Sequence, residues 1–231
     1  MKVIIKYFLP AYLLICIAGC DDNNLMHQKY LDEGETLYIG KTLYLVDSAG
    51  NERVKFSWIL NSDPRIDKSV FSWTDGETDH SVEIAIRRTQ SGYLIMDTIL
   101  SVKEGIYTFS LKNRDDKGHE SMPLERTVQV YGPTYISKLS NRNLSSSFAD
   151  GKLTVNWVII ENALIQYSTV QYTDYSNPAN PVRKSIRIEN TDTQTEIEGV
   201  REGDTFSIFS SYLPEGGLDI LDASPVEYTI R

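Results

Sequence analysis

The stretch RVKFSW, residues 53–58, alternates polar and apolar side chains and ends in a tryptophan. A period of two residues is typical of a β-strand with one face in the core and the other in solvent. The stretch LTVNW, residues 153–157, alternates in the same way and also ends in a tryptophan. Trp58 and Trp157 lie 99 residues apart, and about 100 residues is the size of one small β domain. The spacing predicts an internal repeat with both tryptophans in a core.

Further positions in the two halves match at or near this offset. An offset of 99 pairs Ser69 with Ser168, Phe71 with Val170, Trp73 with Tyr172, Thr74 with Thr173 and Asp75 with Asp174. The segment ILSVKEG at 99–105 matches IEGVREG at 197–203 at an offset of 98. SVEI at 81–84 has a looser partner, SIRI at 185–188, and the larger offset of 104 fits an added loop, SNPANP, in the second copy.

Each copy consists of short alternating segments separated by Gly, Pro, Asn and Asp turns, without a sustained helical period. About seven short strands in about 100 residues are typical of an immunoglobulin-like sandwich. We therefore predict an all-β chain with two tandem β-sandwiches, at residues 30–131 and 132–231. Gly132-Pro133 separates the two copies, and residues 135–139 are predicted to begin the first strand of the second.

A cysteine-free sandwich with a tryptophan in its second strand resembles fibronectin type III. In that family, a loop precedes a tyrosine near the start of the sixth strand, whose hydroxyl holds the corner of the sheet. The segment VKEGIYTF, residues 102–109, places Val102, Gly105, Tyr107 and Phe109 in this pattern. The second copy has Phe206 near the position of the tyrosine, so we expect no hydrogen-bonded corner there.

The first twenty residues have the features of a bacterial lipoprotein signal. Two lysines precede an apolar run that ends at Gly19, and the run is shorter than the roughly 20 residues of a membrane span. The ending Ile17-Ala18-Gly19-Cys20 resembles the lipobox, which implies cleavage before Cys20 and attachment of acyl chains such as palmitate. We expect a lipoprotein signal peptide at 1–19, a lipidated Cys20 and a tether at 20–29. The alternatives are an ordinary signal peptide with an accidental cysteine, or a buried thiol in a membrane segment.

The charge balance restricts the class of partner. The formal net charge is −9, with 32 Asp and Glu against 23 Lys and Arg, and loss of the signal would remove two further lysines. This balance argues against nucleic acid or an anionic lipid surface as a partner. We expect contact with the membrane through the lipid on Cys20.

The sequence also lacks the motifs of common catalytic sites. His27, His80 and His119 are scattered without the spacing of metal ligands, and neither a phosphate-binding glycine loop nor a Gly-x-Ser-x-Gly elbow occurs. We predict a protein that is not an enzyme and has no metal and no cofactor. The TDGETDH segment, residues 74–80, has acidic side chains at alternate positions whose oxygens could bind a calcium ion. Its Asp-Gly pair is also what a hairpin turn requires, and we favour the turn.

Aromatic side chains are the candidates for ligand binding, because sugars stack on exposed rings. Trp73, Tyr172 and Tyr175 are the predicted ligand-binding residues, and the long segment at 172–181 is the first place to expect a site, since loops at the ends of sandwiches often bind ligands. Partly exposed packing in the third strand of each sandwich is the alternative for Trp73 and Tyr172, and we favour it.

The mature chain is similar to a family of uncharacterised Bacteroidetes lipoproteins that have a domain of unknown function. The similarity rests on the lipobox and on the segments YLDEGETLYIGK (30–41), RVKFSW (53–58), SDPRIDKSVFSWTDG (62–76) and VYGPTYISKLSNRNL (130–144). It implies a protein anchored at the outer membrane by its lipid. Asp21 and Asp22 resemble the acidic signal for surface export in that phylum, so we expect the cell surface, with the periplasmic face as the alternative.

Three functions remain open at this point. We favour a non-catalytic surface accessory module that binds glycan or another extracellular ligand. The alternatives are an adhesive or structural spacer that binds proteins through sandwich edges or loops, and a hydrolase with an unrecognised set of carboxylates. The triplets Asp47-Ser48-Ala49 and Asp97-Thr98-Ile99 are also similar to a pattern that Bacteroidetes O-glycosylate on exported proteins.

Overall fold

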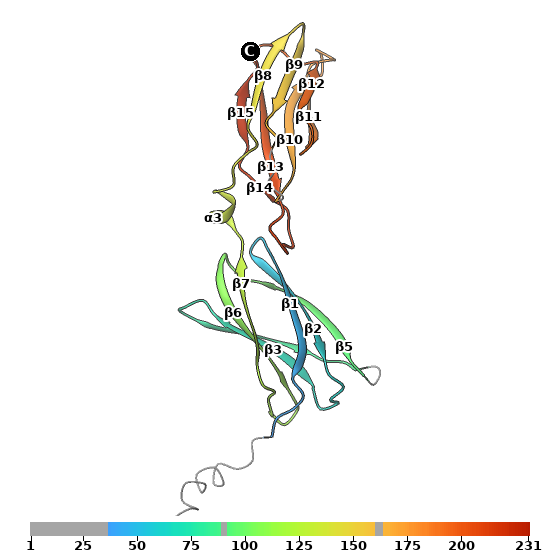
Figure 1. The fold of residues 1–231 in the computed structure, drawn as a ribbon, viewed down its shortest axis with the longest axis vertical. Helices are drawn as coiled ribbons and strands as arrows, with labels where there is room; N and C mark the ends of the chain where they lie inside the picture. Colours follow the sequence, from blue (N-terminus) through green and yellow to red (C-terminus); the bar gives the residue numbers. More distant parts are fainter. Residues whose placement is uncertain (1–36, 89–91, 160–163) are drawn as a thin grey trace, which may run out of the picture. The chain divides into compact units, whose positions relative to one another are not determined.

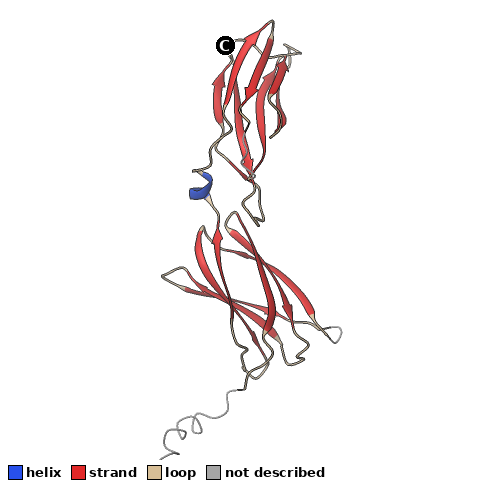
Figure 2. Cartoon of the chain, in the orientation of Figure 1, coloured by secondary structure: helices blue, strands red, loops and turns tan. Residues whose placement is uncertain are grey.

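The computed structural model describes residues 37–88, 92–159 and 164–231, and its ribbon is shown in Figure 1. The predicted signal peptide and tether, and residues 30–36 of the predicted first sandwich, lie outside these residues. Within the described residues the chain is built almost wholly of strands, as Figure 2 shows. In the described part of the chain, no helix is long and apolar enough to span a membrane. The prediction of an all-β fold is confirmed.

Seven strands form the first sandwich. They are β1 (Thr42–Gly50), β2 (Arg53–Leu60), β3 (Lys68–Thr74), β4 (Asp79–Ala85), β5 (Leu94–Ser101), β6 (Gly105–Arg114) and β7 (Leu124–Val130). A three-stranded sheet has the order β1-β2-β5, and a four-stranded sheet has the order β4-β3-β6-β7. All neighbouring strands are antiparallel.

The second sandwich repeats this arrangement. Its strands are β8 (Leu144–Ala149), β9 (Lys152–Trp157), β10 (Ile165–Asp174), β11 (Val182–Glu189), β12 (Gln194–Glu198), β13 (Thr205–Tyr212), β14 (Leu221–Asp222) and β15 (Val226–Thr229). One sheet has the order β12-β9-β8, and the other has the order β11-β10-β13-β14, with β15 also paired to β13. In each sandwich the first, second and fifth strands form one sheet, so the predicted repeat is also a repeat of topology, and the fold is that of tandem fibronectin type III-like sandwiches.

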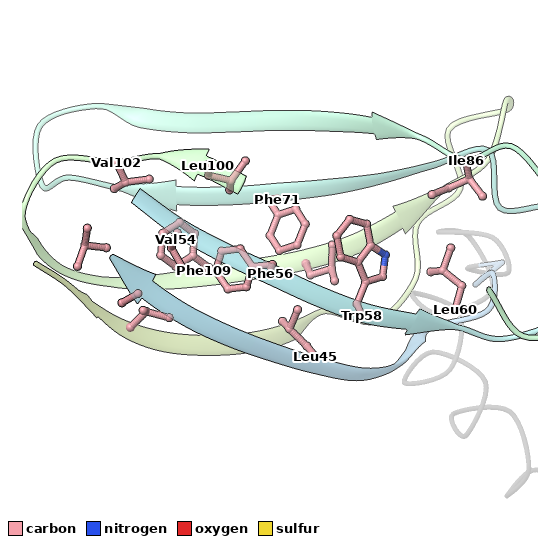
Figure 3. Close-up of a cluster of buried hydrophobic side chains, with 14 of the residues drawn as sticks. Leu45, Val54, Phe56, Trp58, Leu60, Phe71, Ile86, Leu100, Val102 and Phe109 are labelled. Atoms are coloured by element: carbon pink, nitrogen blue, oxygen red, sulfur yellow. The ribbon is translucent and has the colours of Figure 1, made fainter. Parts of the chain in front are cut away.

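The alternation in β2 decides which side chains enter the core of the first sandwich. Val54, Phe56, Trp58 and Leu60 all point inward and are fully buried (Figure 3). The ring of Phe56 lies between two rings of the opposite sheet, with centroids 4.8 Å from that of Phe71 and 4.9 Å from that of Phe109. Each large buried ring removes on the order of 200 Å² from water, which stabilises a sandwich that has no disulfide between its sheets.

The second sandwich has a core of its own, which contains Trp157 together with Leu153 and Val155 from the same strand. Both tryptophans are thus core residues, as predicted. Phe206 is buried near the position that the fibronectin type III pattern gives to the corner tyrosine. Its ring stacks on that of Tyr228, with centroids 5.4 Å apart. In the first sandwich the ring of Tyr107 packs so closely over Gly105 that a Cβ there would lie 2.9 Å from its hydroxyl oxygen.

The junction between the sandwiches differs from the prediction. Residues 135–139 do not begin a strand: Pro133–Ile136 forms a short helix, α3, and β8 begins only at Leu144. Pro133 is at the first turn, where its fixed φ favours a helix and its missing N–H costs nothing. The carboxylate of Glu104 accepts hydrogen bonds from the N–H groups of Thr134 (2.7 Å) and Tyr135 (2.6 Å). The helix therefore depends on a residue 30 positions earlier in the chain, which local pattern does not reveal.

Candidate functional site

Of the three predicted ligand-binding residues, Tyr172 is buried. Only 8% of its surface is exposed, and it belongs to the core of the second sandwich, near the end of β10. A ring in this position has almost no face to offer to a sugar. The alternative interpretation, packing in the third strand, describes Tyr172 better.

Tyr175 follows β10 directly, and its ring is covered by a neighbouring side chain. The guanidinium of Arg201 lies over the ring, 3.9 Å from its centroid, and a hydrogen bond to Asp204 raises the pKa of the Tyr175 hydroxyl. Asp174, the last residue of β10, accepts hydrogen bonds from both the N–H (2.8 Å) and the hydroxyl (2.6 Å) of Ser176 in the loop. The polar groups at the start of the long loop are thus used to hold the loop itself.

Trp73 lies in the first sandwich at the end of β3, in a column of three rings. One side of its indole contacts Phe109 in the core, with centroids 5.4 Å apart, and the other side stacks on His80 at 5.3 Å and 17°. The outer ring of the column is therefore the imidazole of His80. The carboxylate of Asp75 lies 2.8 Å from Nε2 of His80, and this hydrogen bond holds the pKa of Asp75 well below its usual range. The structure thus brings Trp73 together with His80, and not with Tyr172 or Tyr175.

Beside this column, the outer face of the sheet β4-β3-β6-β7 is hollowed. A space of about 440 Å³, here called the hydroxyl hollow, is lined by Ser72, Trp73, Thr74, Asp79, His80, Ser81, Thr108 and Ser110. Strand pairing produces this lining, because Ser72 lies directly opposite Ser81 on β4 and opposite Ser110 on β6. Directly opposite residues point to the same face of a sheet, so three hydroxyl groups from three strands converge on one place.

A second space, the charged hollow, continues the hydroxyl hollow along the sheet. It has about 260 Å³ and is lined by Val70, Ser72, Ser81, Glu83, Lys112, Arg114 and Glu120. The two hollows share Ser72 and Ser81. At the other end, a cleft of about 260 Å³ that reaches Tyr107 and Lys103 shares Trp73 and His80 with the hydroxyl hollow. Trp73, His80 and Tyr107 alternate along their strands with Ser72, Ser81 and Thr108 and therefore point to the inner face of the sheet, so this cleft lies on that face. The hydroxyl hollow and the charged hollow are the two spaces that adjoin on the outer face.

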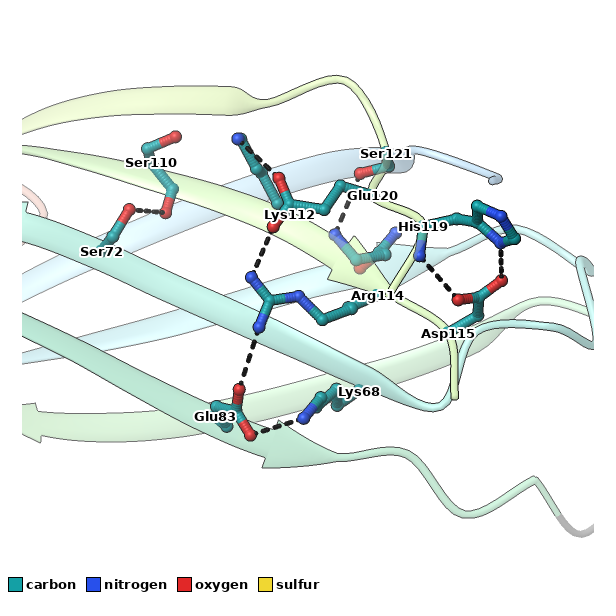
Figure 4. A network of polar contacts seen from close by, with 11 residues as sticks. Lys68, Ser72, Glu83, Ser110, Lys112, Arg114, Asp115, His119, Glu120 and Ser121 are labelled. Carbon is teal, nitrogen blue, oxygen red and sulfur yellow. Dashed lines mark hydrogen bonds and ion pairs between the residues drawn. The ribbon is translucent and has the colours of Figure 1, made fainter. Parts of the chain in front are cut away.

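The charged hollow contains a chain of ion pairs, drawn in Figure 4. Lys68 Nζ lies 2.7 Å from Glu83, Arg114 bridges Glu83 and Glu120, and Lys112 Nζ lies 2.8 Å from Glu120. The hydrogen bond from Lys68 lowers the pKa of Glu83, and those from Lys112 and Arg114 lower the pKa of Glu120. Both carboxylates are therefore ionised at neutral pH, and each hydrogen-bonded side chain is held in place by its partner.

The calcium alternative finds no support in the geometry of the 74–80 segment. Oδ1 of Asp75 accepts hydrogen bonds from the N–H groups of Glu77 (3.0 Å) and Thr78 (2.8 Å), and Gly76 has a positive φ of 93°. These are the bonds of a hairpin turn, as favoured from the sequence. Among the residues that the structure describes, no group of three or more His, Cys, Asp or Glu is placed to hold a metal ion.

Sequence reasoning missed this outer surface, since Trp73 points to the inner face of the same sheet. Ser72, Ser81, Ser110 and Arg114 are ordinary residues in their local context, at the outward positions of alternating strands. The signal that could have found them is the register between β3, β4 and β6, since it places the hydroxyls side by side.

The chain has detectable relatives, but they are distant. A family described as a domain of unknown function matches residues 20–220. No curated protein matches the chain. Among solved structures, a two-domain fibronectin type III segment of chicken tenascin is 15% identical, covering 83% of this chain and 99% of that one, with a TM-score of 0.34.

Two further solved structures are similar at the same level. The FN1–FN3 domains of chicken CNTN1 are 10% identical over 84% of this chain and 66% of that one, with a TM-score of 0.37. The chicken interferon gamma receptor alpha chain is 16% identical over 82% and 98%, with a TM-score of 0.35. These scores are too low to carry an argument, and the fold assignment rests on the strand order described above.

Proposed function

The chain belongs to the DUF4998 family, a domain of unknown function, and we propose that it is a non-catalytic, lipid-anchored module of the cell envelope that binds glycan through the outer face of its first sandwich. The observation that carries the proposal is the pair of adjoining hollows on this face, which runs from the hydroxyls of Ser72, Ser81 and Ser110 to the ion pairs around Arg114. This surface replaces the second sandwich as the place where we expect a ligand.

The groups that line the hollows suit a polyhydroxy ligand. Serine and threonine hydroxyls both donate and accept hydrogen bonds, and ionised carboxylates and guanidinium groups make stronger ones. Each charged group here keeps its protein partner, so it can hold a neutral hydroxyl without leaving a charge unpaired. An open, polar and shallow surface of this kind fits an extended saccharide better than a drug-like apolar ligand, which prefers an enclosed apolar pocket.

Long side chains cover part of the matching face of the second sandwich. Gln171 lies opposite Ser185, as Ser72 lies opposite Ser81 in the first sandwich. The guanidinium of Arg183 reaches Gln171 at 3.3 Å, and that of Arg187 lies 3.9 Å from the ring centroid of Tyr167. The repeat therefore gives the experiment its own matched control.

A glycan array tests the proposed binding surface. The probe is the chain from residue 20 to 231 with Cys20→Ser, compared with the same chain carrying Ser81→Arg, which fills the place that the two hollows share. We expect saturable binding that falls at least tenfold in Ser81→Arg and is unchanged in the control Ser185→Arg. Binding that survives Ser81→Arg would place the ligand elsewhere, and a blank array with folded protein would favour the protein-binding spacer.

The lipid anchor is proposed from the lipobox-like Ile17–Cys20 and is tested separately. Cells that express the full chain are fed an alkyne-labelled palmitate, and the outer membrane is isolated. We expect label on the wild-type chain and none on Cys20→Ser, with protease treatment of intact cells removing the chain if it faces outward. An unlabelled wild-type chain would reject the anchor without affecting the glycan result.

A further inference from the structure

The outer face of the other sheet of the first sandwich, β1-β2-β5, carries an exposed apolar patch. Tyr44, Ile59 and Ile95 lie directly opposite one another on the three strands, so their side chains form one row on the outer face. Tyr44 is 60% exposed and Ile95 is 75% exposed, and Tyr93, just before β5, is 70% exposed. A contiguous patch of this kind, in contrast to scattered apolar residues, indicates an interaction surface.

The repeat shows how far this face differs between the two sandwiches. Three successive rows cross the face in the first sandwich, and each contains an exposed apolar residue: Tyr44–Ile59–Ile95, Val46–Ser57–Asp97 and Ser48–Lys55–Ile99. The rows of the second sandwich that match the second and third of these are polar, with Ser145–Asn156–Gln194 and Ser147–Thr154–Glu196. Val158, which matches Ile59 at the offset of 99, is 52% exposed. The first sandwich therefore has exposed apolar residues in all three rows, whereas two of the matching rows in the second sandwich are polar.

The patch lies at the end of the sandwich where the chain arrives from its N-terminal side. Gly40, just before β1, donates its N–H to Asp63 at 2.8 Å and accepts a hydrogen bond from Nδ2 of Asn113 at 2.9 Å. The guanidinium of Arg88 donates hydrogen bonds to the carbonyl of Asn61, just after β2, and to the carbonyl of Gly92, just before β5. The most apolar row is the one nearest this end, and the row farthest from it contains Arg53 and Ser101 instead.

We infer that this patch rests on the lipid bilayer in which the proposed lipid on Cys20 is inserted. The inference rests on the proposed anchor: the segment from Cys20 to Leu37 can span at most about 60 Å, and it joins the first sandwich at the end that carries the patch. Tyrosine rings favour the interface between headgroups and acyl chains, and lipid anchors are commonly reinforced by a second contact with the bilayer. Exposed charges near this end have both signs, with Lys41 and Arg87 against Asp67 and Asp116. Apolar contact with a neutral bilayer therefore fits better than attraction to anionic lipid.

The test attaches the chain to vesicles without depending on lipidation in cells. Cys20 is the only cysteine from residue 20 onward, so the chain from 20 to 231 can be coupled through it to a maleimide lipid in phosphatidylcholine vesicles. Hydroxyl-radical footprinting with mass spectrometry then reports side-chain exposure. We expect oxidation of Tyr44, Tyr93 and Ile95 to fall at least threefold on vesicles, and that of Ile106, which is 72% exposed on the other sheet, to stay the same.

Two variants separate contact at the patch from general shielding by the vesicle. Tyr44→Ser combined with Ile95→Ser should return the oxidation of Tyr93 to its value in solution, whereas Ile106→Ser should leave the protection intact. Equal oxidation of Tyr44 with and without vesicles would overturn the inference. Protection of the patch from oxidation in solution, without vesicles, that rises with protein concentration would also overturn the inference. It would show that a second copy of the chain covers the patch. Failure of palmitate labelling in cells rejects the natural anchor, while this measurement still reports on the patch.

Discussion

Arg142 shows how a single residue can hold several loops of a sandwich. It precedes β8, is only 1% exposed, and has no carboxylate among its hydrogen-bond partners. Its guanidinium donates to the carbonyls of Val158 (2.8 Å), Glu189 (3.0 Å), Asn190 (3.2 Å) and Asp192 (2.6 Å). Burial lowers the pKa of the guanidinium, but four carbonyl acceptors compensate for its lost water and join the ends of β9 and β11.

Arg142→Met should lower the free energy of unfolding of the second sandwich by about 3 kcal/mol, because four carbonyls lose their donor. Urea unfolding of residues 132–231, in which Trp157 is the one tryptophan, measures the change by fluorescence. Arg187→Met is the matched control: Arg187 is exposed and paired with Glu189 at 2.7 Å, and exposed pairs contribute only about 0–1 kcal/mol. Equal losses in the two variants would contradict this account of Arg142.

Asp63 gives the first sandwich a dependence on pH. Its carboxylate accepts hydrogen bonds from the Arg65 side chain (3.0 and 2.8 Å) and from the N–H groups of Gly40 and Arg65. The Arg65 side chain is the main cause that holds the pKa of Asp63 well below its usual range, against the opposing effect of burial. A lowered pKa means that the stabilisation is present above the unfolded-state pKa of about 4 and is lost as the pH falls below it.

The difference in unfolding free energy between wild type and Asp63→Asn should therefore be largest near pH 6 and shrink steadily towards pH 2.5. Urea titrations at a series of pH values measure this difference. A difference that stayed constant over the whole range would show that the charge of Asp63 contributes nothing.

At the scale of elements, a buried polar group links four strands of the first sandwich. Oδ1 of Asn113 on β6 accepts hydrogen bonds from the hydroxyls of Thr42 on β1 (3.3 Å) and Ser69 on β3 (2.9 Å). Ser69 in turn accepts one from Nε1 of Trp58 on β2 at 3.2 Å. The repeat handles the matching positions differently: Ser168 bonds to Ser210 at 3.0 Å, and Trp157 donates to Thr195 at 2.9 Å.

Ser69→Ala should therefore cost more than Ser168→Ala. Ser69→Ala leaves the N–H of a tryptophan without its acceptor and removes one of the two donors to Asn113, so we expect the free energy of unfolding to fall by about 2 kcal/mol. Ser168→Ala removes one hydrogen bond from Ser210, which still accepts one from the N–H of Arg142, so we expect a fall of about 1 kcal/mol. Chemical unfolding of the two variants under the same conditions gives the comparison. The reverse order would mean that the link through Asn113 does not stabilise the sandwich.

At the scale of the whole molecule, the two sandwiches have separate hydrophobic cores, with no residue in common. Each core takes side chains from both of its own sheets, and this is what an independently folding unit requires. An ion pair between Arg53 and Asp219 joins the two sandwiches, but Arg53 is about half exposed, so its contribution is small.

Each half should therefore fold alone. Residues 20–131 with Cys20→Ser and residues 132–231 should each show a cooperative thermal transition, within a few degrees of the corresponding transition in the full chain. Near-ultraviolet circular dichroism of Trp58 and Trp157 follows the two cores. A half that unfolds without cooperativity, or that has no tryptophan signal, would show that the two sandwiches are one folding unit.

Much of the fold could be predicted because its determinants are local in the chain. Alternation in 53–58 and 153–157 identifies the buried face of each second strand, and Asp75-Gly76 identifies a turn wherever its neighbours lie. The Glu104 cap on α3 could not be predicted in this way, since its two partners are distant in sequence. Trp73 and Tyr172 occupy the same position of the repeat and both pack against a core, yet Trp73 is only partly buried and Tyr172 is buried, because different neighbours surround them.

By itself, the sequence determined the β class, the tandem repeat, the inward position of both tryptophans and the lipobox-like segment at Cys20, because each depends on the order of residues over a short stretch. The tertiary structure alone decided which surfaces we propose for a ligand and for the bilayer. Strand register brings Ser72, Ser81 and Ser110 together from three strands, and it aligns Tyr44, Ile59 and Ile95 on the opposite sheet. Both surfaces are made by residues that become neighbours only when the strands pair, so neither has a signature along the chain.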